Sequence, residues 1–246
     1  MGLNKRLFVP QDTGTTYAGY TSDLKVHYNA ADSSSVSGTT FVDISGGANL
    51  NASLQGNASF NSGGWVDLDG SNDYINIPNN VVTSINSGGA RALTISLWIY
   101  NTGSANFEWI LGKGGQSGDW EYDAYVDFRS ASKGFVGNTY YQGANNLQVD
   151  GRTSNNTWLT RNSWEMLTLG IDNANDEMKL WQGNSLLGTD TTASYPTTAG
   201  SSNSLHIGQR PDLNYDWTGR VNNIRIYEGI ISQTTVNEIF AAGYQG

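Results

Sequence analysis

The sequence predicts an all-β fold, a sandwich or barrel of short strands that ends in one helix. Its 246 residues include 30 glycines, eight tryptophans and 13 tyrosines, together with many serines, threonines and asparagines. This composition fits short strands joined by tight turns. Apolar and polar residues alternate in a series of short segments, and no strand–helix–strand pattern indicates a parallel sheet. A single antiparallel domain of this length is ordinary and buries a sizeable core.

The clearest strand is Leu93–Tyr100, in which alternate residues point to opposite faces. We expect its aliphatic face to line the core: Leu93, Ile95, Leu97 and Ile99. The opposite face carries Thr94, Ser96, Trp98 and Tyr100. The segment Val66–Pro78 reads as one short strand. Further strands are predicted at Leu24–Tyr28, Phe107–Lys113, Glu121–Arg129, Phe135–Tyr141, Trp158–Leu159, Trp164–Asp172, Met178–Trp181, Leu205–Gly208 and Gly219–Tyr227.

The two ends of the chain differ from this strand-rich centre. Residues 1–23 are rich in turn residues and lack alternation, so we expect an N-terminal arm that contacts another chain. The domain itself is expected to cover residues 24–246. At its end, Ser232–Ala242 predicts a helix that Ser232 caps and Gly243 terminates. The apolar stripe of this helix is Val236, Ile239 and Phe240.

The charge balance limits the possible partners. With 13 basic and 22 acidic residues the net charge is −9 and the pI is about 4.5. We therefore expect neither nucleic acid nor an anionic membrane as a partner, because both repel an acidic surface. Charged residues make up only 14% of the chain, which leaves a neutral, hydrogen-bonding surface suited to glycans or to further copies of the chain.

The sequence also suggests where the chain is made. It contains no cysteine and no run of 18 apolar residues, so we expect no disulfide and no membrane insertion. After Lys5-Arg6 the apolar run Leu7–Val9 stops at Pro10, which leaves no apolar core for a signal peptide. We therefore expect synthesis in the cytoplasm without export by a signal peptide.

The order of segments over residues 24–243 resembles the laminin-G-like, concanavalin A-like jelly roll. The segments that carry this resemblance are Val66–Pro78, Trp164–Asp172, Met178–Trp181, Gly183–Gly188, Leu205–Gly208 and Gly219–Tyr227. The resemblance implies two stacked antiparallel sheets, one of them concave, with the final helix packed at an edge. It also implies a fold that mostly binds ligands, often glycans.

Some segments resemble the version of this domain found in tailed-phage structural proteins: Leu24–Asp32, Ser37–Gly46, Phe60–Gly64 and Asp69–Tyr74. That resemblance implies a virion protein on the capsid or tail, joined to other virion proteins through residues 1–23. Related domains often carry an acidic pair that helps to hold calcium where this chain has Asn222-Asn223. Two lost carboxylates lower the affinity for calcium.

The segment Glu121–Arg129 contains the candidate binding site. Period-2 alternation places one set of its side chains toward the core: Tyr122, Ala124, Val126 and Phe128. The other set combines a ring that can stack on a sugar with hydrogen-bonding groups: Asp123, Tyr125, Asp127 and Arg129. Trp120 and Tyr140, on adjacent loops, are expected to rim this surface. The alternatives are a solvated strand face and a contact with a neighbouring protein.

The same segment argues against an enzyme. Some glycan hydrolases of the resembling fold carry Glu-x-Asp-x-Glu on one strand, with the two glutamates as nucleophile and acid/base. Here Glu121-x-Asp123 leads to Tyr125, and Asp127 lies about 20 Å from Glu121 along an extended strand. His27 and His206 stand on separate strands and indicate neither a catalytic triad nor a zinc site.

Calcium is the metal that the sequence leaves open. Asp43, Asp69 and Asp73 lie in glycine-rich turns, where carboxylate and carbonyl oxygens can converge on a cation. The alternative, which we favour, is that they cap turns through hydrogen bonds to backbone amides.

Three functions follow from these observations. The expected one is a non-enzymatic virion protein that displays a lectin-like domain, made in the host cytoplasm and carried out on the particle. The alternatives are a free carbohydrate-binding lectin and a glycan hydrolase of the same fold.

Overall fold

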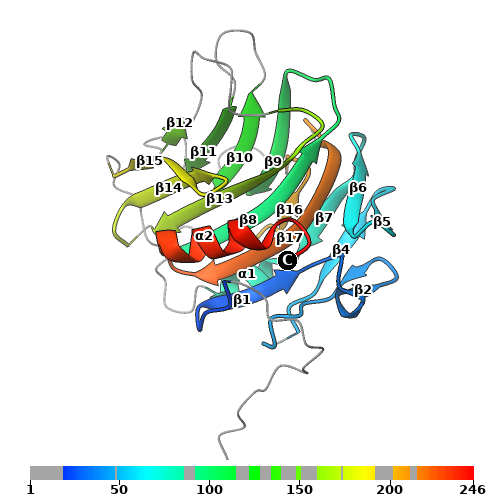
Figure 1. The fold of residues 1–246 in the computed structure, drawn as a ribbon, viewed down its shortest axis with the longest axis horizontal. Helices are drawn as coiled ribbons and strands as arrows, with labels where there is room; N and C mark the ends of the chain where they lie inside the picture. The colour runs from blue at the N-terminus through cyan, green and yellow to red at the C-terminus, as the bar shows by residue number, and fades with distance from the viewer. Residues whose placement is uncertain are drawn as a thin grey trace, which may run out of the picture.

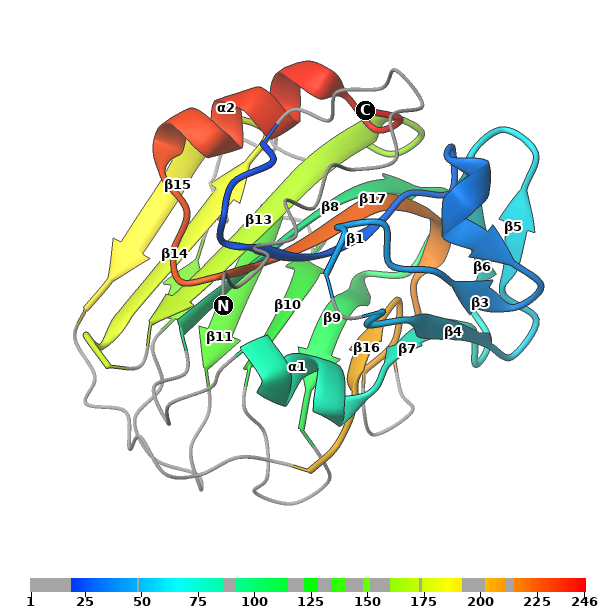
Figure 2. The same ribbon diagram turned by 90° about the horizontal axis from the view of Figure 1, so that it is seen from below.

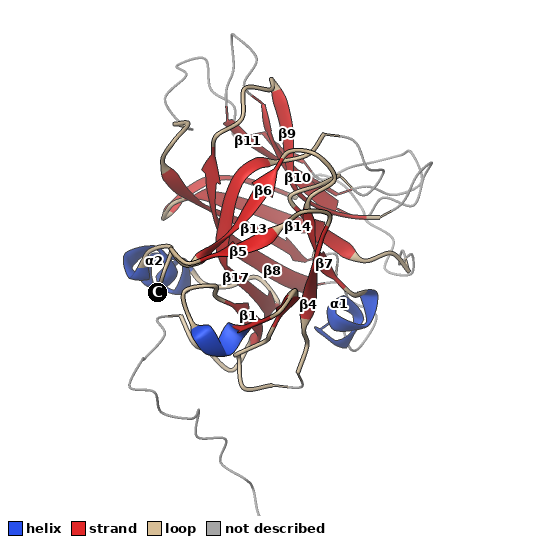
Figure 3. Ribbon diagram, turned by 90° about the vertical axis from the view of Figure 1, so that its right-hand side faces the viewer, coloured by secondary structure: helices blue, strands red, loops and turns tan. Residues whose placement is uncertain are grey.

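The computed structural model describes residues 19–47, 49–85, 92–114, 122–127, 134–139, 148–150, 160–172, 174–191, 202–210 and 215–246. These residues form two antiparallel sheets, stacked face to face around an apolar core (Figure 1). Helices α1 (Asn79–Ile85) and α2 (Gln233–Ala242) lie on opposite sides of the strands (Figures 2 and 3). The predicted all-β sandwich with a C-terminal helix is confirmed. In the described segments, no helix has the length and apolarity needed to cross a membrane.

The first sheet, called sheet A, is built around two long central strands, β8 and β17. Along its path the strands are β15 (Ser185–Asp190), β14 (Glu177–Gln182), β13 (Trp164–Asp172), β8 (Ala92–Asn101), β17 (Thr218–Glu228), β6 (Trp65–Asp69) and β5 (Ser59–Asn61). Strand β1 (Leu24–Tyr28) also pairs with β17. Several predicted strands thus pair with one another here, and β13 has the predicted bounds.

The second sheet, called sheet B, contains the strands of the candidate site. Along its path the strands are β12 (Gln148–Asp150), β11 (Gly134–Thr139), β10 (Tyr122–Asp127), β9 (Phe107–Lys113), β16 (Leu205–Ile207), β7 (Tyr74–Ile77), β4 (Ala52–Gln55), β3 (Thr40–Phe41) and β2 (Val36–Ser37). A 3₁₀ turn, η1 (Ser33–Ser35), precedes β2. The predicted strand Trp158–Leu159 lies outside the described residues.

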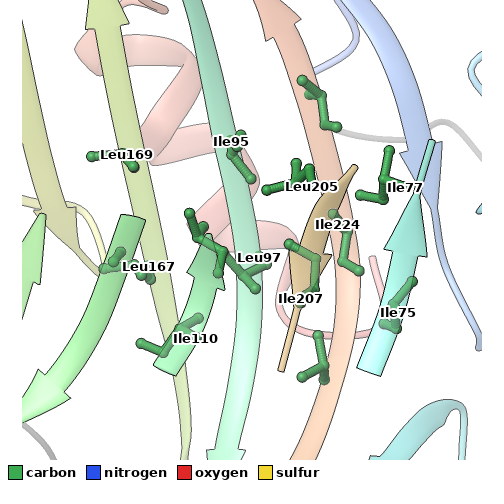
Figure 4. Packing of buried hydrophobic residues seen from close by; sticks show 14 of the residues in the cluster. Ile75, Ile77, Ile95, Leu97, Ile110, Leu167, Leu169, Leu205, Ile207 and Ile224 are labelled. Atoms are coloured by element: carbon green, nitrogen blue, oxygen red, sulfur yellow. The ribbon is translucent and has the colours of Figure 1, made fainter. Parts of the chain in front are cut away.

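Side chains from both sheets fill the space between them (Figure 4). Ile95 and Leu97 of sheet A, for example, share the core with Ile207 of sheet B. The predicted interior face of β8 is confirmed, because all four of its aliphatic side chains are at most 1% exposed: Leu93, Ile95, Leu97 and Ile99.

The opposite face of β8 is also buried, which the alternation alone does not reveal. Helix α2 packs against this outer face of sheet A, and Trp98 stacks on Phe240 of the helix with ring centroids 5.8 Å apart. Thr94 is fully buried; its hydroxyl donates a hydrogen bond to the Gly229 carbonyl (2.8 Å) and accepts one from the Ile231 amide (3.1 Å). Both faces of this strand therefore contribute to stability.

Helix α2 has the predicted ends. The Ser232 hydroxyl accepts a hydrogen bond from the Thr235 amide at 3.1 Å, and Gly243 ends the helix with a φ of 79°. Val236 and Ile239 are fully buried in a second apolar cluster with Met166, Trp181 and Tyr227 of sheet A. The helix thus closes one side of the sandwich and leaves the outer side of sheet B to other segments.

The segment predicted as one strand over Val66–Pro78 is two strands in different sheets. Strand β6 belongs to sheet A and β7 to sheet B, and the chain crosses between them through a turn at Gly70 and Asn72, with φ of 83° and 63°. The core positions shift from Val66 and Leu68 to Ile75 and Ile77, so the alternation changes phase across the polar, glycine-containing turn. Helix α1, which follows β7, was not predicted.

The described part of the expected arm contacts its own domain. The Gly19 carbonyl accepts a hydrogen bond from the Tyr227 hydroxyl (3.0 Å), and the Tyr20 hydroxyl donates one to the Ile44 carbonyl (3.1 Å). Residues 1–18 lie outside the described residues, so an arm that contacts another chain stays a prediction.

Candidate functional site

Strand β10 carries the centre of the candidate site. Its inward side chains Tyr122, Ala124 and Val126 are buried in the shared core, as predicted, whereas Asp123 and Tyr125 belong to the outer face of sheet B. The remaining predicted members of the segment and its rim lie outside the described residues: Trp120, Glu121, Phe128, Arg129 and Tyr140.

Aromatic rings from neighbouring segments gather around Tyr125. Trp109 of β9 stacks on Tyr125 with ring centroids 4.7 Å apart and an interplanar angle of 26°. The Phe107 ring centroid lies 5.3 Å from that of Tyr125. The ring centroid of Tyr215, a residue between β16 and β17, lies 5.4 Å from that of Trp109. The Arg210 guanidinium carbon lies 4.9 Å from the Trp109 ring centroid, within cation–π range. We call these five residues the aromatic face.

A bulge in β9 sets the orientation of Trp109. Ala124 pairs with Leu111 and the next residue, Tyr125, pairs with Trp109, so Ile110 is an extra residue in β9. As a result, Ile110 and Leu111 both point into the core, and Trp109 reaches the outer face. Bulges of this kind re-aim side chains and are common beside functional sites.

Asp123 holds Trp109 in place. One carboxylate oxygen accepts a hydrogen bond from the Trp109 indole (3.1 Å), and the other accepts one from the Asn138 side-chain amide (2.9 Å). Asp123 and Asp127 are each only 1% exposed. Asp123 therefore braces the aromatic face from below. The rings of Phe107 and Tyr125 are partly exposed and that of Tyr215 is exposed.

Tyr215 has the most exposed ring of the aromatic face. Its side chain is 51% exposed, and its backbone adopts a φ of 64°, which costs free energy in a residue with a side chain. The Tyr215 carbonyl accepts a hydrogen bond from the Trp109 amide (3.1 Å), which holds residue 215 against β9. The sequence reasoning missed Tyr215, Trp109, Phe107 and Arg210. The alternation of Phe107 and Trp109 was visible, but no local signal marks Tyr215.

His206 lies on the same outer face, one strand beyond β9. Register pairing aligns it with Gly112 and Asp123 on one side and with Asn76 on the other. The imidazole stacks on Tyr74 with ring centroids 4.3 Å apart. Burial lowers the pKa of His206 to about 4, so the ring is neutral at physiological pH. A neutral ring suits packing and hydrogen bonding rather than charge recognition.

The three turn aspartates proposed for calcium accept backbone hydrogen bonds. The Asp43 carboxylate accepts hydrogen bonds from the backbone amides of His27 (3.0 Å) and Ser45 (2.9 Å). The Asp73 carboxylate accepts one from the backbone amide of Asp69 (2.9 Å). Asp69 in turn accepts from the Ser71 amide at 2.8 Å. Among the described residues, no three His, Cys, Asp or Glu side chains form a metal-ligating group. The geometry favours the turn-capping alternative, and calcium at these aspartates stays a prediction.

Comparison with models of known protein families assigns the chain to a superfamily. Residues 69–237, more than half of the sequence, match the family model described as the concanavalin A-like lectin/glucanases superfamily. The chain belongs to this superfamily. The predicted laminin-G-like, concanavalin A-like identity is thereby confirmed at the level of the superfamily. A search of curated protein sequences found no match to this chain.

Several solved structures share the fold. A domain of an extracellular arabinanase from Geobacillus stearothermophilus, solved with arabinotriose, has a TM-score of 0.59 at 14% identity over 88% of this chain and 98% of that domain. Botulinum neurotoxin type C has a TM-score of 0.64 at 17% identity over 89% of this chain and 51% of that chain. Trypanosoma rangeli sialidase has a TM-score of 0.65 at 15% identity over 94% of this chain and 35% of the sialidase chain.

At these identities the likeness establishes the fold alone. This superfamily member matches the whole arabinanase domain but spans about half of the neurotoxin chain and about a third of the sialidase.

The Asn222-Asn223 pair has a structural role in this superfamily member. Both residues are fully buried, and the Asn222 amide donates hydrogen bonds to the Tyr244 carbonyl (2.7 Å) and to Asn29 (3.1 Å). The Asn223 amide donates to the carbonyls of Gly243 (3.0 Å) and Gly246 (2.6 Å). Carboxylates lack these donors, so the amides join β17 to the segment that follows α2.

Proposed function

We propose that this chain is a non-enzymatic carbohydrate-binding module whose ligand lies on the aromatic face. The observation that carries the proposal is the pair of accessible rings, Tyr125 and Tyr215, arranged around Trp109. Tyrosine rings supply contact area at a small cost in conformational entropy, and their hydroxyl groups can hydrogen-bond a sugar. Membership of the superfamily supports the proposal, because its members include lectins.

Two of the similar proteins also support carbohydrate as the ligand class. The arabinanase domain was solved with arabinotriose, and cell entry of botulinum neurotoxin type C depends on interaction with two ganglioside molecules. Both ligands contain sugars, although the proteins differ widely in sequence from this chain. We therefore extend the ligand class, but not the particular sugar, from these proteins to this chain.

The arrangement of carboxylates supports a binding module rather than a hydrolase. Asp127 lies four positions after Asp123, so their Cα atoms lie about 13 Å apart along the strand. Glycosidases place their two carboxyl groups about 5–10 Å apart. Asp123 accepts hydrogen bonds from Trp109 and Asn138. Burial raises the pKa of Glu108, but this carboxylate points inward and accepts hydrogen bonds from Asn101 (2.7 Å) and the Thr218 amide (3.1 Å).

The experiment that tests this function is a titration with arabinotriose and a panel of neutral oligosaccharides, followed by NMR of the ¹⁵N-labelled chain. We expect weak affinity, roughly millimolar to micromolar, because an open face buries little of a small ligand. Shifts should centre on β9, β10 and Tyr215. Tyr215→Ala should weaken binding, whereas Leu186→Ala, which removes a comparably exposed apolar side chain from sheet A (47% exposed), should not. Shifts that avoid the aromatic face, or no shifts with any ligand, would contradict the proposal.

We also propose that the module works as part of a larger assembly, a virion, with the segment over residues 1–23 as its docking arm. The support is the resemblance of Leu24–Asp32 and Ser37–Gly46 to tailed-phage structural proteins. The arabinanase, neurotoxin and sialidase do not add to it, since their likeness to this chain establishes the fold alone. Mass spectrometry of purified particles from the source organism tests this part, and absence of the chain from the particles would contradict it.

A further inference from the structure

A row of polar and aromatic side chains crosses the outer face of sheet A, beyond the area under α2. Register pairing places five residues directly beside one another on consecutive strands: Ser59, Asp67, Arg220, Tyr100 and Trp164. Their neighbours Val66 and Val221 point into the core. The row therefore presents a hydroxyl, a carboxylate, a guanidinium, a phenol and an indole on one surface.

Two aromatic rings hold Arg220 flat. Its guanidinium carbon lies 4.5 Å from the Trp65 ring centroid and 4.7 Å from the Tyr100 ring centroid. Trp65 is fixed in turn, because its indole donates a hydrogen bond to Asp67 (2.8 Å). These contacts order a side chain that would otherwise lose considerable conformational entropy on binding a ligand.

The hydrogen-bonding capacity of Arg220 is largely unused. Its nearest acceptor is Asp67, at 3.7 Å, which is an ion-pair distance but too long for a hydrogen bond. Within the described part of the chain, no group accepts a hydrogen bond from its five N–H groups. The Arg220 and Asp67 side chains are 34% and 42% exposed, so solvent or a ligand can reach both.

A cavity of about 290 Å³ opens beside this guanidinium. Its polar lining comes from Asn57, Ser59, Asp67, Asp69, Thr102 and Arg220. The volume lies just below the usual range of small-molecule pockets, about 300–1,000 Å³, which suits a ligand of about one sugar ring. Amide, hydroxyl, carboxylate and guanidinium groups in the lining match the donors and acceptors of a polyol.

We propose that this cavity, called the Arg220 pocket, is a second binding site, and that its ligand is a single residue of a neutral saccharide. Arg220 donates to the sugar hydroxyl groups, while Asp67 and Asp69 accept from them. Trp65 and Tyr100 do not line the cavity; they hold the Arg220 guanidinium beside it. The site lies on the opposite sheet from the aromatic face and does not depend on it.

The charge of the lining selects a neutral ligand over an acidic one. Three carboxylates, those of Asp67, Asp69 and Asp73, stand against the single guanidinium of Arg220. A sialic or uronic acid would bring a further negative charge close to these carboxylates, which repel it. Hydroxyl groups satisfy both donors and acceptors without this repulsion.

The Trp65 indole gives a local reporter for this pocket. We propose to label the tryptophans with ¹⁵N, assign the Trp65 indole signal with Trp65→Phe, and titrate the methyl pyranosides of glucose, galactose and mannose. N-acetylneuraminic acid serves as the acidic comparison. At least one neutral glycoside should shift the Trp65 signal to saturation. The same shift should occur in Tyr215→Ala, because that substitution changes only the aromatic face.

Two substitutions test the roles of the side chains. Arg220→Lys keeps the charge but loses the planar donor array, and should weaken binding about fivefold or more. Asp67→Asn keeps the shape and should also weaken binding. Lys179→Gln, at a partly exposed ion pair elsewhere on sheet A, is the control and should leave sugar binding unchanged. Thermal melts verify that each variant is folded.

The possible results separate this inference from the proposed function. If no glycoside moves the Trp65 signal, if Arg220→Lys and Asp67→Asn bind as the wild type does, or if the acidic sugar binds better than the neutral ones, the Arg220 pocket is not the proposed site. Shifts confined to β9, β10 and Tyr215 would leave the aromatic face as a binding site and overturn the second one.

Discussion

The outer faces of the two sheets differ, although the strands beneath them alternate in the same way. On sheet A, helix α2 covers part of the face opposite the core, and buried polar groups such as Thr94 hydrogen-bond to the segment that leads into the helix. On sheet B, the corresponding residues form the aromatic face, with Tyr215 half exposed. A period of two identifies the two faces of a strand. It does not tell which of them meets a helix and which meets a ligand.

The largest expected effect tests the two faces of β8. Leu97→Ala should lower the free energy of unfolding by about 2–5 kcal/mol, because it leaves a cavity in the core. Thr94→Ala should cost about 1–3 kcal/mol rather than a few tenths, since the Ile231 amide loses its buried acceptor. Urea unfolding measures both. Thr189→Ala, at an exposed position of β15, is the control and should stay within about 0.5 kcal/mol. A Thr94→Ala cost as small as the control would mean that α2 does not seal this face.

The next effect concerns the support beneath the aromatic face. Asp123→Ala should lower the free energy of unfolding by about 1–3 kcal/mol, because the Trp109 indole and the Asn138 amide lose their acceptor. It should also weaken sugar binding by releasing Trp109. Asp23→Ala, at an exposed aspartate near the N-terminal end of β1, should change neither quantity. Unchanged stability in Asp123→Ala would show that the carboxylate does not brace the indole.

Tyr215→Gly should separate binding from stability. Glycine adopts the positive φ of residue 215 without strain, so the free energy of unfolding should stay within about 1 kcal/mol of the wild type or rise. Loss of the exposed ring should weaken binding of a sugar at the aromatic face about tenfold. Calorimetry of unfolding and NMR titration of the same sample measure the two. Full retention of binding would remove Tyr215 from the site.

The smallest expected effect is a change in pH dependence. Burial holds the pKa of His206 near 4, below its usual 6.5, so folding favours the neutral ring. This contribution to stability is complete above pH 6.5 and is lost as the pH falls toward 4. His206→Gln should therefore lose less stability over that interval, as urea unfolding at a series of pH values would show. His27, whose pKa burial also lowers, remains in the variant, so part of the acid sensitivity should persist. Identical pH profiles for wild type and variant would contradict this role of His206.

Much of the fold followed from local patterns in the sequence. The core face of β8, the bounds of β9 and β13 and both ends of α2 were predicted, because alternation and capping act over a few residues. The prediction of one strand over Val66–Pro78 was wrong, since a turn at Gly70 and Asn72 moves the chain from one sheet to the other and shifts the phase of the alternation. The short helix α1 carried too weak a pattern to be recognised.

The candidate site was predicted in part. Strand β10 was predicted, and the inward orientation of Tyr122, Ala124 and Val126 is confirmed, whereas sugar binding by Tyr125 stays a prediction. Asp123 accepts a hydrogen bond from the Trp109 indole, and its contact with a sugar stays a prediction. Tyr215 joins the candidate site from more than 80 residues farther along the chain.

The sequence by itself determined which residues alternate, where the last helix begins and ends, and that the surface is acidic and rich in neutral polar groups. The tertiary structure alone decided that α2 covers sheet A, that the bulge in β9 turns Trp109 outward, and that Arg220 lies between two rings beside a cavity. The physical reason is the range of the interactions. Strand periodicity and helix capping depend on near neighbours in the chain, whereas strand order, bulges and ring stacking depend on contacts between segments far apart in sequence.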